Sequence, residues 1–91
     1  MAMIAVQLKV DGRGVVPALQ EAREKLDGAE GELVLDFSSV GRIDARVLGA
    51  MEELAAEAEQ KGVKIVLRGA SVDVYRVLKL TRMAPRFSFT N

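Results

Sequence analysis

The stretch from Leu33 to Met51, LVLDFSSVGRIDARVLGAM, constrains the fold of this 91-residue chain more than any other part of the sequence. It opens with an apolar run that ends at Asp36, crosses a polar loop, and reaches Asp44 at the start of an amphipathic segment. Such an unbroken apolar run is typical of a central strand covered on both faces. The stretch therefore predicts a strand, a loop over residues 37–43 and the start of a helix, a junction at which α/β domains usually bind ligands or partners.

Hydrophobic periodicity places the other elements around this junction. Over Met3–Val10, apolar and polar residues alternate with the period of two that an edge strand with one buried face requires. The remaining predicted elements, in chain order, are a helix over about Pro17–Asp27, a helix from about Asp44 that ends at Lys61 and Gly62, a strand over Val63–Leu67, a helix capped by Ser71 that frays near Thr81, and a tail in which Phe87 and Phe89 pack as a final helix or a short extended segment.

The order of these elements is strand, helix, strand, helix, strand, helix and tail. Strand-helix-strand crossovers are right-handed and favour parallel neighbouring strands. We therefore predict a single α/β domain over residues 1–91, with amphipathic helices packed against a small, mostly parallel or mixed sheet of three or four strands. The sequence contains no internal repeat and no linker that would divide it.

The composition excludes several classes of chemistry. Lys and Arg number 13 and Asp and Glu number 13, so the net charge is zero and does not indicate binding to nucleic acid or to an anionic membrane surface. The chain also has no Cys and no His. A thiol nucleophile, a disulfide, a Ser-His-Asp triad and a zinc site of the usual kind are therefore excluded, and we expect no metal and no cofactor.

Hydropathy along the chain bears on its location. No stretch approaches the roughly 18–20 apolar residues that are needed to cross a bilayer. The first ten residues lack the basic start and the longer apolar centre of a secretory signal. We therefore expect a cytoplasmic protein that does not insert directly into a membrane.

The central stretch is followed by a Glu-rich helix and then by KGVKIVLRGA and SVDVYRVLKLTRMAPRF. This combination resembles a STAS domain, the fold of bacterial anti-sigma factor antagonists, over roughly residues 32–87. Members of that family commonly carry Asp-Ser-Ser-Gly-Leu at the loop-to-helix junction, and the first serine is phosphorylated by a partner kinase that is itself the anti-sigma factor. The matching residues here are Asp44, Ala45, Arg46, Val47 and Leu48.

Two departures from the family pattern bear on function. Ala45 stands where the family has its phosphoacceptor serine, and without a hydroxyl it cannot carry the charge of a phosphate group. The family also usually opens with a hairpin of two strands, whereas this sequence predicts one strand before Pro17. The resemblance therefore implies a trimmed domain without phosphorylation control at Ala45.

The resemblance implies a non-enzymatic module that binds a protein, which would be an anti-sigma kinase, a signalling assembly or a transporter subunit. An alternative is a small STAS subunit of a bacterial ABC-type lipid transport complex. A receiver-like phosphoacceptor is least favoured, because no acidic pair follows the first strand to hold magnesium; Asp36 is expected to accept hydrogen bonds from loop amides instead. The predicted partner-binding residues are Ser38, Ser39, Val40, Gly41, Arg42, Asp44, Ala45, Arg46 and Gly49.

Each of these features also has a structural interpretation. The loop can be an ordinary connector, with Asp44 acting as a helix cap. Arg82 and Arg86, near the aromatic residues of the tail, are candidates to anchor an anion or a partner, although aromatic residues in a tail more often close the core. The acidic side chains of the second helix are expected to form a solvated face, or less often a docking surface for a basic partner; they are Glu52, Glu53, Glu57 and Glu59.

Overall fold

The computed structural model describes residues 6–10, 14–29 and 31–90. Its elements follow the chain as β1 (Val6–Lys9), α1 (Val15–Lys25), the 3₁₀ turn η1 (Leu26–Gly28), β2 (Glu32–Asp36), α2 (Ala45–Lys61), β3 (Lys64–Arg68), α3 (Val72–Leu80), the 3₁₀ turn η2 (Ala84–Arg86) and β4 (Ser88–Thr90). The predicted α/β class is confirmed. The start of the predicted first strand, residues 3–5, lies outside the described residues.

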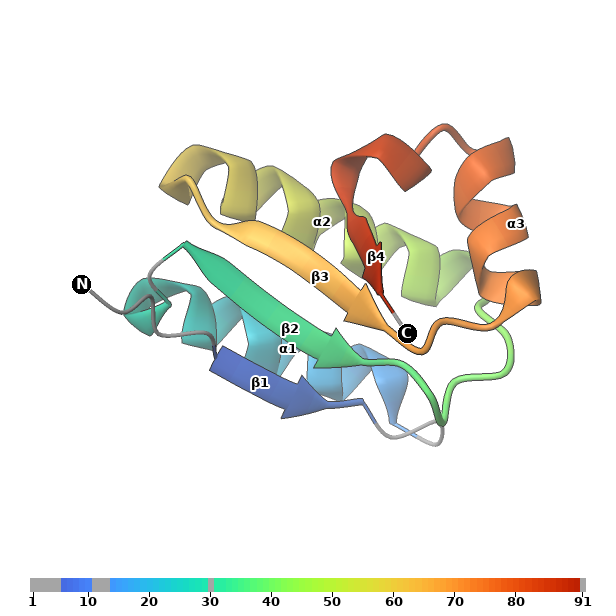
Figure 1. Cartoon of the computed structure of the whole chain (residues 1–91), viewed down its shortest axis with the longest axis horizontal. Helices are drawn as coiled ribbons and strands as arrows, with labels where there is room; N and C mark the ends of the chain where they lie inside the picture. The colour runs from blue at the N-terminus through green and yellow to red at the C-terminus, as the bar shows by residue number, and fades with distance from the viewer. Residues whose placement is uncertain (1–5, 11–13, 30, 91) are drawn as a thin grey trace.

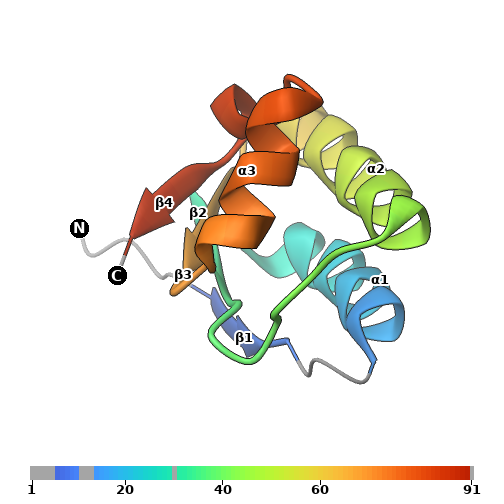
Figure 2. The ribbon, with the colours of Figure 1, turned by 90° about the vertical axis from the view of Figure 1, so that its right-hand side faces the viewer.

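The four strands form one sheet in the order β1-β2-β3-β4, and each neighbouring pair is parallel. The register aligns Leu8 with Leu35, Leu35 with Leu67, and Leu67 with Phe89, so one apolar row crosses the whole sheet. Because right-handed crossovers join parallel strands that lie in chain order, the three helices fall on the same face of the sheet. Figures 1 and 2 show this two-layer arrangement.

Exposure along β2 corrects one part of the prediction. Leu33 and Leu35 are fully buried, but Val34 between them is only half-buried. Val34 lies beside Val66 on the face that points away from the helices. The apolar run therefore forms a central strand that the described helices cover on one face, and not on both as its composition suggested.

The helix α1 begins at Val15, two residues before the predicted start at Pro17. Proline is tolerated there because the amides of the first helical turn have no carbonyl partner within the helix. Leu19 and Ala22 are buried against the sheet, and η1 then buries Leu26. The observed start differs from the predicted one because proline is tolerated at several positions of the first turn and so does not identify the first residue of the helix.

The tail forms the 3₁₀ turn η2 and then β4, which is the extended outcome of the two that the sequence allowed. Phe87 is buried at 6% exposure. Phe89 is partly exposed and meets the ring of Tyr75 edge-on, with the ring centroids 5.0 Å apart. The largest fully buried side chains of the core are Val10, Leu19, Leu26, Leu33, Leu35, Phe37, Val40, Met51, Leu54, Leu67, Val74 and Leu78.

Candidate functional site

Two apolar side chains fix the loop between β2 and α2 to the core. Phe37 is fully buried and Val40 is 2% exposed. The Phe37 amide donates to the Arg68 carbonyl at 2.8 Å, and the Val40 amide donates to the Phe37 carbonyl at 2.9 Å. Because these contacts hold the backbone, Ser38 and Ser39 are presented to solvent from a fixed position.

The end of β3 packs directly against this loop at Gly69. The backbone there has φ +70°, and a Cβ atom added at Gly69 would lie 3.1 Å from the Cβ of Ser38. The Gly69 amide also donates to the Thr90 carbonyl at 2.9 Å, which joins the turn to β4. Glycine is needed here both for the left-handed conformation and for the close approach.

Asp36 is the last residue of β2, and the expectation that it accepts a hydrogen bond from a loop amide is confirmed. Its Oδ1 accepts from the Ser38 amide at 2.9 Å and from the Ser38 hydroxyl at 2.6 Å. The Ser38 hydroxyl, then the Ser38 amide, and then the charges of Lys9 and Arg68 lower the pKa of Asp36 below its ordinary value of 3.8, although partial desolvation opposes the shift. The ionised carboxylate is therefore the form that holds the loop.

This pKa shift predicts an acid-dependent loss of stability. Because the pKa of Asp36 is lower in the folded protein than in the unfolded chain, its contribution is present above the unfolded pKa and is lost as the pH falls through the folded one. We expect the free energy of unfolding, measured by urea titration, to fall more between about pH 6 and about pH 2.5 for the native chain than for Asp36→Asn. Equal pH dependence of the two proteins would contradict this role of Asp36.

The start of α2 is capped as the sequence predicted. The Asp44 side chain accepts a hydrogen bond from the Val47 amide at 2.9 Å, and Ala45 is the first helical residue. Gly62 ends the helix in the left-handed conformation with φ +69°. The carboxylate of Asp44 is thus used by the helix itself, whereas the neighbouring side chains of Ala45 and Arg46 are exposed.

The N-terminus of α3 supports the loop from a third direction. The Ser71 hydroxyl donates to the Gly41 carbonyl at 3.2 Å and accepts from the Val74 amide at 3.2 Å. Ser71 therefore acts as the predicted cap of α3 and also joins that helix to the loop. In Figure 2 the loop is the green segment that runs from β2 to the start of α2, with α3 nearby.

The structure brings the predicted partner-binding residues together at this junction, with one correction. Val40 is buried, because its side chain fills the core under the loop, so that side chain cannot contact a partner. The other eight of the nine predicted residues are exposed. We call this set the junction surface; it consists of Ser38, Ser39, Gly41, Arg42, Asp44, Ala45, Arg46 and Gly49.

A groove beside the junction surface contains residues that the sequence analysis did not single out. Its α2 side includes Ala45 and Gly49, and its α1 side includes Val16 and Gln20. The sequence did offer one signal for this groove. Successive right-handed crossovers place α1 and α2 side by side on one face of the sheet, so a groove between these two helices could be expected. This signal could not indicate which residues of α1 border the groove, because that depends on the rotation of the helix.

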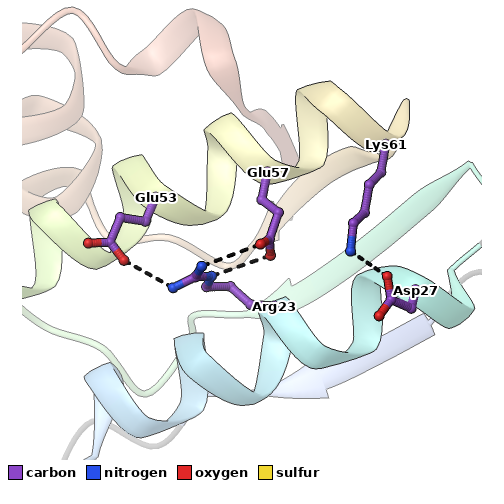
Figure 3. A network of polar contacts seen from close by, with 5 residues as sticks. All are labelled: Arg23, Asp27, Glu53, Glu57 and Lys61. Atoms are coloured by element: carbon purple, nitrogen blue, oxygen red, sulfur yellow. Dashed lines mark hydrogen bonds and ion pairs between the residues drawn. The ribbon is translucent and has the colours of Figure 1, made fainter.

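Ion pairs that join α2 to α1 and η1 correct the interpretation of the acidic face. Arg23 lies between Glu53, at 3.0 Å, and Glu57, at 3.3 Å, and Lys61 pairs with Asp27 (Figure 3). The hydrogen bond from Arg23 lowers the pKa of Glu57. Glu53 and Glu57 therefore join α2 to α1 and do not belong to a freely solvated face.

The tail is joined to α2 in the same way. Arg86 donates to Glu59 at 3.0 Å and 3.1 Å, and this contact lowers the pKa of the Glu59 carboxyl. Arg86 was a candidate to anchor an anion, but its guanidinium instead connects η2 to the helix. Such exposed pairs each contribute little to stability, typically below about 1 kcal/mol.

Neither a metal cluster nor a membrane-crossing helix is found in residues 6–10, 14–29 and 31–90. No three His, Cys, Asp or Glu side chains among them are grouped so that they could hold a metal ion. None of the helices in the same ranges has both the length and the apolar character needed to cross a bilayer.

Comparisons with known proteins agree with this architecture. The family described as "Mlab, STAS domain" matches residues 2–85. A Thermotoga maritima protein provisionally named an anti-sigma factor antagonist has a TM-score of 0.71 and 18% sequence identity, with 99% of this chain and 83% of that chain covered. A sulfate transporter family protein from Wolinella succinogenes has a TM-score of 0.81 and 18% identity, with 99% and 80% covered.

At 18% identity these two structures show a common fold and nothing more specific. The family match spans most of the sequence and includes the loop, Asp44 and the whole of α2. The chain therefore belongs to the STAS domain family.

Proposed function

We propose that this domain is a non-enzymatic module that binds a partner protein through the junction surface. The observation that carries the proposal is the combination of exposed polar residues with a rigid support. Ser38, Ser39 and Arg42 are exposed, while Phe37 and Val40 beneath them are buried. A surface that is already ordered before binding loses little conformational entropy when a partner docks.

The residue at the start of α2 determines how this contact is controlled. Ala45 is exposed, but it offers no hydroxyl for a phosphate. A phosphorylated serine would place almost two negative charges beside Asp44 and so alter the contact. With alanine there, binding through the junction surface is constitutive with respect to phosphorylation at that position.

The partner is an anti-sigma kinase, a component of a signalling assembly, or a subunit of a transporter. The name of the Thermotoga maritima protein supports the first of these, and the name of the Wolinella succinogenes protein supports the last. A small subunit of a bacterial ABC-type lipid transport complex is the second candidate function. Both functions use the same fold, and the identity of the bound partner separates them.

The test compares two Ala→Glu variants of the same helix. Ala45→Glu places a carboxylate within the junction surface, and Ala56→Glu places one at an exposed position more than two helical turns further along α2. Glutamate is favourable or neutral at a helix N-terminus, so Ala45→Glu is expected to fold normally and to keep its melting temperature. The native chain and both variants serve as baits for affinity capture, with quantitative mass spectrometry of the retained proteins.

We expect a partner to be retained by the native chain and by Ala56→Glu, and to bind Ala45→Glu about tenfold more weakly, because an uncompensated charge is then buried at the contact. A retained kinase or sigma regulator favours the regulatory function, and a retained transport ATPase favours the second candidate. Equal retention by folded Ala45→Glu, or no specific retention by the native chain, would remove the junction surface from the proposal.

A further inference from the structure

Gly49 is a glycine within a helix, and no contact with the described residues explains why glycine is needed there. It is the fifth residue of α2 and is exposed. Glycine inside a helix lowers stability relative to alanine, because the unfolded chain gains conformational freedom without a side chain to pack. A glycine in this position therefore calls for a physical reason other than helix formation.

The two usual reasons for glycine are both missing at this position. Gly31, Gly62 and Gly69 have positive φ angles, whereas Gly49 does not. A Cβ atom added at Gly69 would lie 3.1 Å from Ser38, but one added at Gly49 would meet nothing within 4 Å. Within the part of the chain that the structure describes, α2 could therefore carry alanine at this position without strain.

The open space beside Gly49 belongs to the groove between α1 and α2. Ala45 lies one helical turn before Gly49, and both line the groove opposite Val16 and Gln20 of α1. Partner proteins commonly dock a helix into a groove of this kind, and the backbones approach most closely where the side chains are smallest. The absence of a Cβ atom at Gly49 lets an external segment approach the backbone of α2.

The charges along the groove indicate how that segment is oriented. At one end, the guanidinium of Arg23 is held by the carboxylates of Glu53 and Glu57. At the other end, Arg46 is exposed and has no ion pair among the described residues. A carboxylate on the docking segment would complement Arg46, whereas the charge of Arg23 at the other end is already balanced by carboxylates of the chain itself.

We propose that this groove is the docking site for a helix of the partner protein, which packs against the backbone of α2 at Gly49 and places a carboxylate opposite Arg46. This inference rests on the proposed function and adds the structural class and the charge of the contacting segment. The junction surface then forms one end of a longer contact that continues along the groove between α1 and α2.

The first arm of the test needs the isolated domain alone. If Gly49 serves a partner and not the fold, Gly49→Ala raises the melting temperature by about 3–6 °C, as expected for a helical Gly→Ala change in a domain of this size. The reverse change at an exposed position of the same helix, Ala56→Gly, lowers it by a similar amount. No rise, or a fall, with Gly49→Ala means that the fold itself requires glycine, and that result overturns the inference.

The second arm measures the affinity of the purified protein that the native chain retains and Ala45→Glu releases, by isothermal titration calorimetry. Gly49→Leu fills the groove and is expected to weaken binding by about tenfold or more. Arg46→Gln is expected to weaken binding and to reduce its salt dependence. The matched controls Ala56→Leu and Lys79→Gln, at exposed positions outside the groove, are expected to bind like the native chain.

The outcomes separate this inference from the proposed function. If Ala45→Glu weakens binding but Gly49→Leu and Arg46→Gln do not, the groove is overturned as a docking site, and the proposed function then stands on the part of the junction surface from Ser38 to Ala45. If the retained protein is a second copy of this chain and Gly49→Leu abolishes its binding, the proposal that a helix of a different partner protein occupies the groove is overturned. If Ala45→Glu binds normally, the proposed function fails, and this inference fails with it.

Discussion

Phe37→Ala is expected to lower the free energy of unfolding by about 3–5 kcal/mol, the usual range for removing a fully buried phenylalanine. The Phe37 ring is fully buried at the point where β2 becomes the loop, so the change leaves a cavity under the junction surface. Domains of this kind are stable by only about 5–15 kcal/mol, so the loss is a large share of the total. Urea unfolding followed by circular dichroism measures it.

Phe89→Ala is the matched control for this prediction. Phe89 is 36% exposed, so its removal takes away less buried area and leaves no closed cavity. We expect a loss of about 1–2 kcal/mol for this variant. Similar losses for both variants would mean that Phe37 is not the apolar anchor of the loop, and Phe37→Leu, which keeps most of the volume, is available if Phe37→Ala does not fold.

Gly69→Ala is expected to lower the free energy of unfolding by about 2–3 kcal/mol. The change forces a left-handed backbone on an L-residue, and it also places a Cβ atom 3.1 Å from the Cβ of Ser38. To relieve that contact, the loop or the end of β3 must move. Chemical unfolding gives the energetic loss, and the amide chemical shifts of Ser38 and Ser39 report the movement.

Gly62→Ala separates the two contributions. Gly62 has nearly the same backbone angle, φ +69°, but a Cβ atom added there would meet nothing within 4 Å. This variant is therefore expected to lose only about 1 kcal/mol, which is the cost of the left-handed conformation. Equal losses at Gly62 and Gly69 would show that the loop yields freely to the added methyl group.

Local signals in the sequence predicted the boundaries of α2 and α3 well, but not the start of α1. Asp44 and Ser71 cap α2 and α3, and Gly62 ends α2, because each acts on backbone groups within a few residues. The short apolar run Leu33–Leu35 likewise located the central strand, although its composition alone did not reveal that Val34 is half-exposed. A residue type indicates that a strand is apolar, but neighbouring elements decide which of its faces are covered.

Features that depend on contacts between distant parts of the chain could not be predicted from the sequence. The strand β4 has only three residues, too few for an alternating pattern, and it is defined by pairing with β3. The contact of Arg23 with Glu53 spans 30 residues and depends on how α1 and α2 are rotated. Val40 is an apolar residue in a polar loop, and only the packing beneath that loop shows that it points inward.

The order of the strands in the sheet has a consequence for biosynthesis. Because β1, β2, β3 and β4 lie side by side in the order in which they occur in the chain, each new strand pairs with the one made just before it. None of the four described strands has to be inserted between two that are already paired, so the sheet can grow from one edge as the chain leaves the ribosome. At each stage, the edge with which the next strand pairs belongs to the strand that was made last.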